Sequence, residues 1–185
     1  MSAWSSFLSR LSVGLHSINE ADLDAFCGEM YKIIDNKGTI YIAGNGGSAS
    51  TADHFQNDIQ AGASKHVPRF KAISMSSNAA LQTTIANDLG YEKIFSYQVE
   101  SMCEPGDGLL LISASGNSSN LLNAALAAKA LGVNTFALLG FDGGKLLHMV
   151  DWPLLVPSDA GDYSVPESAH LIIDHYFMEF CRTHV

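Results

Sequence analysis

The chain has few basic residues. Its 185 residues include ten Lys and Arg against 19 Asp and Glu, which gives a formal net charge of −9. Nucleic acids are bound by clustered positive side chains, so this charge balance argues against a nucleic-acid partner. It does not exclude a small anion, because backbone N–H groups can hold a phosphate without net positive charge.

Cysteine and long apolar runs are also scarce. The three cysteines, Cys27, Cys103 and Cys181, form no CxxC pair and no obvious disulfide framework, which favours a reducing cytoplasm. The N-terminus lacks a basic segment followed by a long apolar run, so no secretory signal is visible. No apolar run reaches the roughly 20 residues that a membrane helix needs. We therefore expect a soluble, cytoplasmic protein.

What the sequence does contain is an alternation of strand-like and helix-like segments. Short apolar, β-rich runs occupy residues 39–43, 70–75, 108–113, 135–139 and 152–156. Helix-like segments occupy residues 21–35, 48–61, 78–87, 94–103, 118–131 and 166–181. Most of the runs lack polar alternation, as strands covered on both faces do. The pattern predicts one α/β domain over residues 1–185, with a doubly wound parallel sheet and a helical arm (1–36) that serves oligomerisation.

The first predicted strand runs into a glycine-rich loop, Gly44-Asn45-Gly46-Gly47-Ser48. Glycines allow a ligand to approach the main chain, and the helix that follows offers free N–H donors and the positive end of its dipole. The loop does not fit the dinucleotide fingerprint, because Ser76 and Ser77 stand where an acidic residue would end the second strand. It predicts an anion site.

The third predicted strand ends in a second loop, Ser113-Ala114-Ser115-Gly116-Asn117-Ser118, which also opens a helix. In open parallel sheets, ligands bind at the carboxyl ends of strands near the topological switch point. The two loops are therefore expected to share one crevice and to bind a phosphate group there. For either loop alone, the residues also suit simple helix caps and turns.

Several stretches, in order along the chain, resemble the sugar isomerase (SIS) domain family. They are the two loops and residues 52–55, 85–91, 105–107, 142–145 and 156–158. The resemblance implies a five-stranded parallel sheet and a homotetramer with active sites at subunit interfaces. It also implies an aldose–ketose isomerase that converts sedoheptulose 7-phosphate to D-glycero-D-manno-heptose 7-phosphate through an enediol. Such a reaction would serve the biosynthesis of lipopolysaccharide or capsule heptose.

The resemblance further implies roles for individual residues. Substrate binding falls to Asn45, Gly46, Gly47, Ser48, Asp88, Ser113, Ala114, Ser115, Ser118 and Glu167. A zinc ion would be held by His54 and Asp58 on one helix, and by Glu167 and His175 on the last helix. Asp58 would be the catalytic base and His175 the acid.

The chain departs from the family pattern at three positions. Asp58 replaces a Glu, Glu167 replaces a Gln, and Gly62 stands where an Arg is usual. His54 and Asp58 are four residues apart and can share one helix face. Two histidines with two carboxylates form a donor set that suits a divalent metal such as zinc.

Two alternatives stay open at this point. The run Ser164-Val165-Pro166-Glu167 is also a good helix start, with a Ser N-cap and a Glu three residues later, which would make Glu167 structural. The departures at Asp58 and Gly62 also fit a non-catalytic SIS module that binds a sugar phosphate or a partner protein in a regulatory role.

Overall fold

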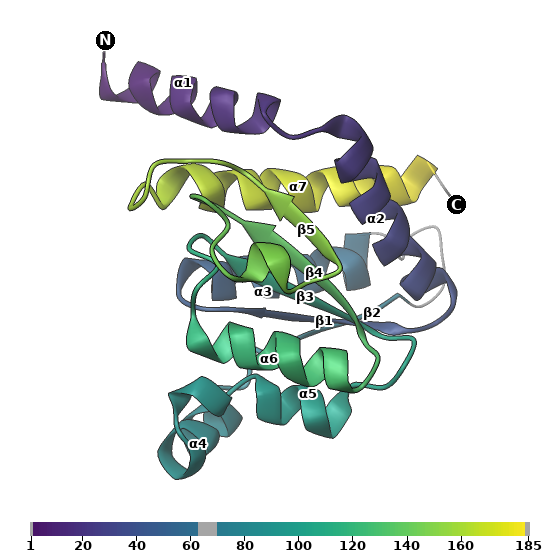
Figure 1. Ribbon diagram of the computed structural model, residues 1–185. Helices are drawn as coiled ribbons and strands as arrows, with labels where there is room; N and C mark the ends of the chain where they lie inside the picture. The colour runs from purple at the N-terminus through teal and green to yellow at the C-terminus, as the bar shows by residue number, and fades with distance from the viewer. Residues whose placement is uncertain (1, 63–69, 184–185) are drawn as a thin grey trace.

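Five parallel strands form the centre of the protein in the computed structural model, which describes residues 2–62 and 70–183. The strand order is β2-β1-β3-β4-β5 (Figure 1). The strands are β1 (Thr39–Gly44), β2 (Lys71–Ser74), β3 (Gly108–Ser113), β4 (Asn134–Leu139) and β5 (Trp152–Leu155). The predicted doubly wound, five-stranded parallel sheet is confirmed.

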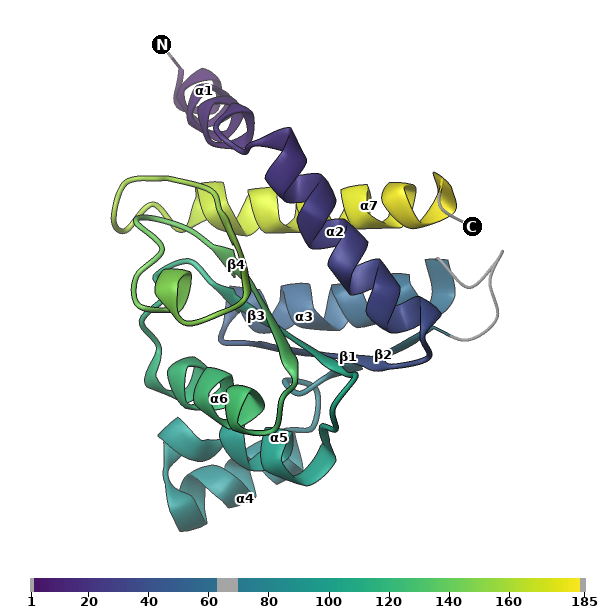
Figure 2. The ribbon, with the colours of Figure 1, turned by 45° about the vertical axis from the view of Figure 1, so that its right-hand side comes forward.

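Helices cover both faces of this sheet. One face packs against α2 (Glu20–Asp35), α3 (Gly47–Asn57) and α7 (Ser164–Thr183), which lie in one layer in Figure 2. The other face packs against α5 (Ser96–Met102) and α6 (Ser119–Ala130), with α4 (Ala79–Leu89) beyond them. Ile42 of β1 belongs to the first core and its neighbours Tyr41 and Ala43 to the second. Successive strand residues point to opposite faces, so burial on both faces explains why the strands lack polar alternation.

The strand order places the two predicted loops side by side. From β1 the chain passes through α3 to β2 at one edge, whereas from β3 it passes through α6 to β4 in the opposite direction. β1 and β3 are hydrogen-bonded neighbours, with Gly44 level with Ile112. The loops 44–48 and 113–118 therefore leave the sheet at its switch point, the usual ligand site of such sheets.

Two helix ends differ from the sequence prediction. The predicted α-helix over residues 48–61 ends at Asn57 and continues as a π-helical turn, Asp58–Gly62. The predicted capping box at the start of α7 is not formed, because Ser164 is itself helical and its hydroxyl donates to Asp162 Oδ1 (2.8 Å). The Glu167 N–H instead donates to the carbonyl of Tyr163 (3.1 Å). The side chain of Glu167 is thus free for another role.

The N-terminal arm is a single helix, α1 (Ala3–His16), which projects beyond the sheet in Figure 1. Trp4, Leu8 and Val13 are exposed on it. Its Arg10 pairs with Asp162 (Nε to Oδ2, 2.8 Å), just before α7. Residues 20–35, which were expected to belong to the arm, form α2, and their buried apolar side chains make that helix part of the core layer.

All three cysteines are free and buried. Burial is the main cause that raises the pKa of each thiol, to about 12 for Cys27, Cys103 and Cys181. These thiols are therefore neutral packing groups. Within the described ranges, none of the helices combines the length and hydropathy that crossing a bilayer requires.

His170 on α7 makes the fold sensitive to acid. Its imidazole is fully buried, Nε2 donates to the Leu139 carbonyl (3.2 Å), and burial lowers its pKa from 6.5 to about 4. Between pH 6.5 and pH 4, His170 is therefore protonated in the unfolded chain but not in the native chain. We expect the free energy of unfolding to fall by about 3 kcal/mol between pH 6.5 and pH 4 through this residue.

Urea unfolding of the metal-free wild type and of the His170→Gln variant across this pH range measures the effect. The contribution of His170 is the difference between the two proteins in the pH dependence of the free energy of unfolding. The Gln amide can keep the bond to Leu139 but does not titrate. Parallel pH profiles of the two proteins would contradict the prediction.

Candidate functional site

A hollow of about 150 Å³ opens at the switch point, between the two loops and the start of α7. It is lined by Asn45, Ser48, Ile112, Ser113, Ala114, Ser115, Ser118, Leu121, Tyr163 and Glu167. Most of the residues predicted to bind substrate are therefore brought together. The hollow also lies at the N-terminal ends of α3 and α6, whose first N–H groups have no partner within their own helix.

Hydroxyl groups in this hollow are only partly used by the local backbone. Ser113 Oγ accepts the Gly116 N–H (3.0 Å), and Ser115 Oγ accepts the Asn117 N–H (3.3 Å). Ser118 is the N-cap residue of α6, yet its side chain makes no capping bond to the described residues. The α3 N-cap is Gly46, so Ser48 does not cap either. Helix capping therefore does not account for the hydroxyl groups of Ser48 and Ser118, whereas an anion bound in the hollow would.

Two residues that the sequence reasoning missed hold Asn45 in place. Asn120 exchanges two amide hydrogen bonds with Asn45 (2.8 and 3.0 Å), and Tyr91 Oη donates to Asn45 Oδ1 (2.8 Å). Asn120 is 1% exposed. An Asn in the first turn of a helix otherwise rich in Ala and Leu was the available signal. These bonds fix the side chain of Asn45 at the edge of the hollow.

Three predicted substrate residues do not line the hollow. Gly46 and Gly47 lie at the start of α3, and a Cβ on Gly47 would collide with the side chain of Glu167, whereas one on Gly46 would meet no described atom within 4 Å. Asp88 is exposed at the end of α4 and accepts a bond from Asn87 Nδ2 (2.7 Å). Its predicted contact with substrate stays a prediction.

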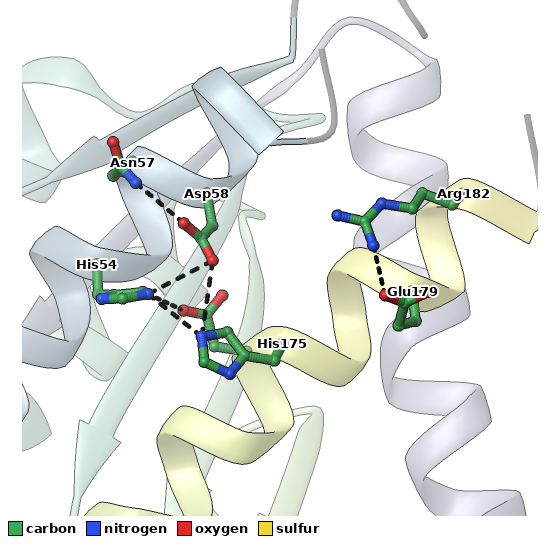
Figure 3. Close-up of polar contacts among 7 residues, drawn as sticks. His54, Asn57, Asp58, His175, Glu179 and Arg182 are labelled. Atoms are coloured by element: carbon green, nitrogen blue, oxygen red, sulfur yellow. Dashed lines mark hydrogen bonds and ion pairs between the residues drawn. The ribbon is translucent and has the colours of Figure 1, made fainter. Parts of the chain in front are cut away.

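A second group of polar side chains lies further along α3 and α7 (Figure 3). His54 Nε2 lies 3.5 Å from Asp58 Oδ2 and 3.4 Å from His175 Nε2. His175 Nε2 lies 4.0 Å from the same Asp58 oxygen, and Asp58 Oδ1 accepts Asn57 Nδ2 (3.0 Å). The structure thus brings together three of the four predicted metal ligands.

The fourth member of this cluster is Asp174, which the sequence reasoning did not consider. One of its oxygens lies 4.0 Å from His54 Nε2, and the four ligand atoms are all within 4.8 Å of one another. Burial, and then the nearby Asp58 carboxylate, raise the pKa of Asp174 to about 8. His170, Asp174, Phe177 and Cys181 are spaced as one buried helical stripe, so an acidic residue on that stripe was the missed signal.

Glu167 does not belong to this cluster. A Cβ placed on Gly47 would lie 2.5 Å from Glu167 Oε2, so this carboxylate lies against the first turn of α3, beside the hollow. Glu167 precedes His175 by two helical turns, about 12 Å along the axis, which separates it from the histidines. Among the described residues, the group that could hold a metal ion contains Asp174 and not Glu167.

Comparison with known proteins identifies the family. A model of the SIS domain matches residues 5–140. The chain belongs to the SIS domain family. A phosphoheptose isomerase from Helicobacter pylori strain Shi470 is 40% identical over 155 residues, covering 84% of this chain and 80% of that protein. One from Sulfurimonas denitrificans is 36% identical over 166 residues, covering 89% and 82%. The predicted resemblance to SIS domains, and among them to phosphoheptose isomerases, is confirmed.

Solved structures give the same result. Phosphoheptose isomerase GmhA from Neisseria gonorrhoeae superposes with a TM-score of 0.86 at 28% identity, covering 97% of this chain and 95% of that one. A phosphoheptose isomerase from Francisella tularensis gives a TM-score of 0.88 at 28% identity, covering 96% and 93%. This SIS chain therefore shares their fold along nearly its whole length.

The cluster on α3 and α7 fits a divalent metal. It combines two imidazoles with two carboxylates, ligand types that zinc accepts in tetrahedral sites. Zinc–ligand bonds of roughly 2.0–2.2 Å place neighbouring ligand atoms about 3.3–3.6 Å apart in a tetrahedron. Four of the six pairs of ligand atoms lie 3.4–4.0 Å apart and the other two within 4.8 Å, so the side chains would have to move inward to reach that geometry.

Proposed function

We propose that this SIS protein is an aldose–ketose isomerase that converts sedoheptulose 7-phosphate to D-glycero-D-manno-heptose 7-phosphate. The observation that carries the proposal is the arrangement of the two sites along α3 and α7. The hollow lies at the start of both helices, and the His/Asp cluster lies further along the same pair.

The spacing between the two sites suits a long sugar phosphate. Both helices follow parallel strands on one face of the sheet, so they run in the same direction. Gly47 is level with Glu167, and His54 is level with His175. Each interval of seven or eight residues spans about 10–12 Å along an α-helix. An extended seven-carbon sugar with its phosphate in the hollow would therefore present its first carbons to the cluster.

The residues of the cluster can move the protons that the reaction requires. The ketose carries its carbonyl at C2. Asp58 would remove a proton from C1 while protonated His175 gives a proton to the C2 oxygen, which forms a 1,2-enediol. His175 would then take the proton from the C1 hydroxyl as Asp58 returns its proton to C2, which leaves the carbonyl at C1. General acid–base groups contribute in this way when they lie within reach of the reacting atoms.

Phosphate binding at a distance supports this chemistry. A phosphate held by Ser48, Ser118 and the helix N-termini contributes binding energy that orients the reacting carbons. We propose zinc as the metal, held by His54, Asp58 and His175. When bound, it would take up His175 Nε2, replace proton donation by His175 through Lewis-acid polarisation of the substrate oxygens, and leave the carbon-bound proton to Asp58.

We also propose the assembly and setting that the family resemblance implies. The exposed Trp4, Leu8 and Val13 on α1 are apolar groups typical of a subunit interface. A homotetramer with active sites at subunit interfaces would cover them. The reaction would take place in the cytoplasm and supply heptose for lipopolysaccharide or capsule.

Proton exchange tests the proposed reaction. The purified chain with zinc and sedoheptulose 7-phosphate in D₂O should incorporate deuterium beside the carbonyl and accumulate the aldose, both followed by NMR. Binding of the ketose phosphate with neither exchange nor aldose would favour the other SIS role, a regulatory module without chemistry. The relatives at 36–40% identity carry the name of the enzyme, which favours turnover.

A further inference from the structure

Asp174 is buried in a way that needs an explanation. Its side chain is 0% exposed, and neither carboxylate oxygen has a hydrogen-bond partner in the part of the chain that the structure describes. Burying a carboxylate without partners costs several kcal/mol, so such a group is usually paired or bound to a metal. An apolar residue would pack better at this position if the carboxylate had no ligand.

The orientation of the neighbouring His54 indicates that the missing partner of Asp174 is a metal ion. The same atom of His54, Nε2, lies nearest to Asp58, to His175 and to Asp174, at 3.4–4.0 Å. A residue that only orients a ligating histidine would bond its other ring nitrogen. Asp174 instead faces the side of the ring from which a metal would be bound.

We propose that Asp174 is the fourth protein ligand of a metal ion held by His54, Asp58 and His175, and that Glu167 is left to the phosphate-binding hollow. Asp58 is one methylene shorter than the Glu of the family pattern, and Asp174 adds an oxygen from the facing helix. The inference concerns the metal site of the proposed isomerase but does not depend on turnover.

Zinc affinity of the metal-free chain tests the assignment, measured by competition with a chromophoric chelator. Asp174→Leu, which keeps the number and branching of the side-chain heavy atoms but removes both oxygens, is expected to weaken zinc binding at least a hundredfold. Asp174→Asn should weaken it at least tenfold, because an amide oxygen is a poorer zinc ligand. Glu167→Gln and the exposed control Asp53→Asn should stay within about twofold of the wild type.

The melting temperature is a second readout, and it is expected to change in opposite directions without and with zinc. Without metal, both Asp174 variants should melt a few degrees above the wild type, since a buried unpaired carboxylate has been removed. With saturating zinc the order should reverse, because only the wild type gains the full stabilisation by ligand binding. A role in packing alone would not reverse the order.

Cobalt reports the ligand set directly. The Co²⁺-loaded wild type should show the intense visible absorption of a four-coordinate site, and Asp174→Asn should shift or lose it, whereas Glu167→Gln should not. The proposal is overturned if zinc does not bind the wild type, if Asp174→Asn binds zinc as tightly, or if Glu167→Gln loses it. Tight zinc binding without proton exchange would instead overturn only the proposed isomerase. If Asp174→Leu does not fold, the nearly isosteric Asn variant decides.

Discussion

Replacing Asp58 with Asn is expected to lower kcat for sedoheptulose 7-phosphate by about a thousandfold, because the amide cannot take the proton from C1. The hollow proposed to bind phosphate lies about three turns away, at the start of α3, and does not contain Asp58. Affinity for inorganic phosphate should therefore change little. Steady-state kinetics with NMR detection of the aldose, together with calorimetric phosphate titration, separate the two effects.

Asp53 provides the matched control for this variant. It lies on α3, five residues before Asp58, is exposed, and does not belong to the cluster. Asp53→Asn removes the same charge from α3 and should retain kcat within about twofold, as surface changes usually do. If Asp58→Asn kept more than a tenth of the wild-type kcat, Asp58 would not be the base.

Replacing Gly116 with Ala should have the largest effect on stability and on phosphate binding. Gly116 adopts φ +61°, and its N–H and C=O bond Ser113 Oγ and the Leu146 N–H. A Cβ there would overlap the carbonyl oxygen of Gly143. Left-handed strain and overpacking together are expected to cost about 3 kcal/mol. Because the loop carries Ser115 and Ser118, phosphate affinity should fall at least tenfold.

Gly132 separates the two causes. It has a similar backbone conformation, φ +71°, but a Cβ there would meet no described atom within 4 Å. Gly132→Ala should therefore show only the left-handed strain, about 1 kcal/mol, with phosphate affinity unchanged. Urea unfolding and phosphate titration of both variants provide the comparison. Equal destabilisation by the two changes would show that contact with Gly143 is unimportant.

Much of the fold could be predicted from the sequence because its strands carry a strong local signal. Runs such as Gly108–Ser113 are buried on both faces, so they are apolar throughout and end in loop residues. The π-helical turn at Asp58 left no such trace, since it depends on contacts made after folding. The helix at residues 21–35 was predicted, but its place in the core layer rather than in the arm was not, because an amphipathic pattern does not show which surface its apolar face covers.

In the candidate site, the two loops were predicted from the sequence, but the membership of the His/Asp cluster was predicted only in part. The two loops could be found because each places glycines and hydroxyls at a helix start, and because the predicted parallel sheet brings both loops to one edge, which caps and turns alone would not require. Glu167 was placed among the metal ligands by analogy with a family position, although a two-turn separation from His175 puts its carboxylate beside Gly47. Asp174 has no counterpart among the family's ligand positions, and only its place on the buried stripe of α7 with His170, Phe177 and Cys181 distinguishes it from a surface carboxylate.

The parallel course of α3 and α7 has a consequence for smaller sugars. The His/Asp cluster lies about two turns further along α3 and α7 than the hollow at their starts, so the fold sets the distance between the two sites whichever sugar binds. A pentose or triose phosphate would satisfy the hollow yet hold its carbonyl short of Asp58. Such compounds should compete with the heptulose phosphate without being turned over. The spacing between the two sites would thus select substrates by length and make shorter sugar phosphates inhibitors.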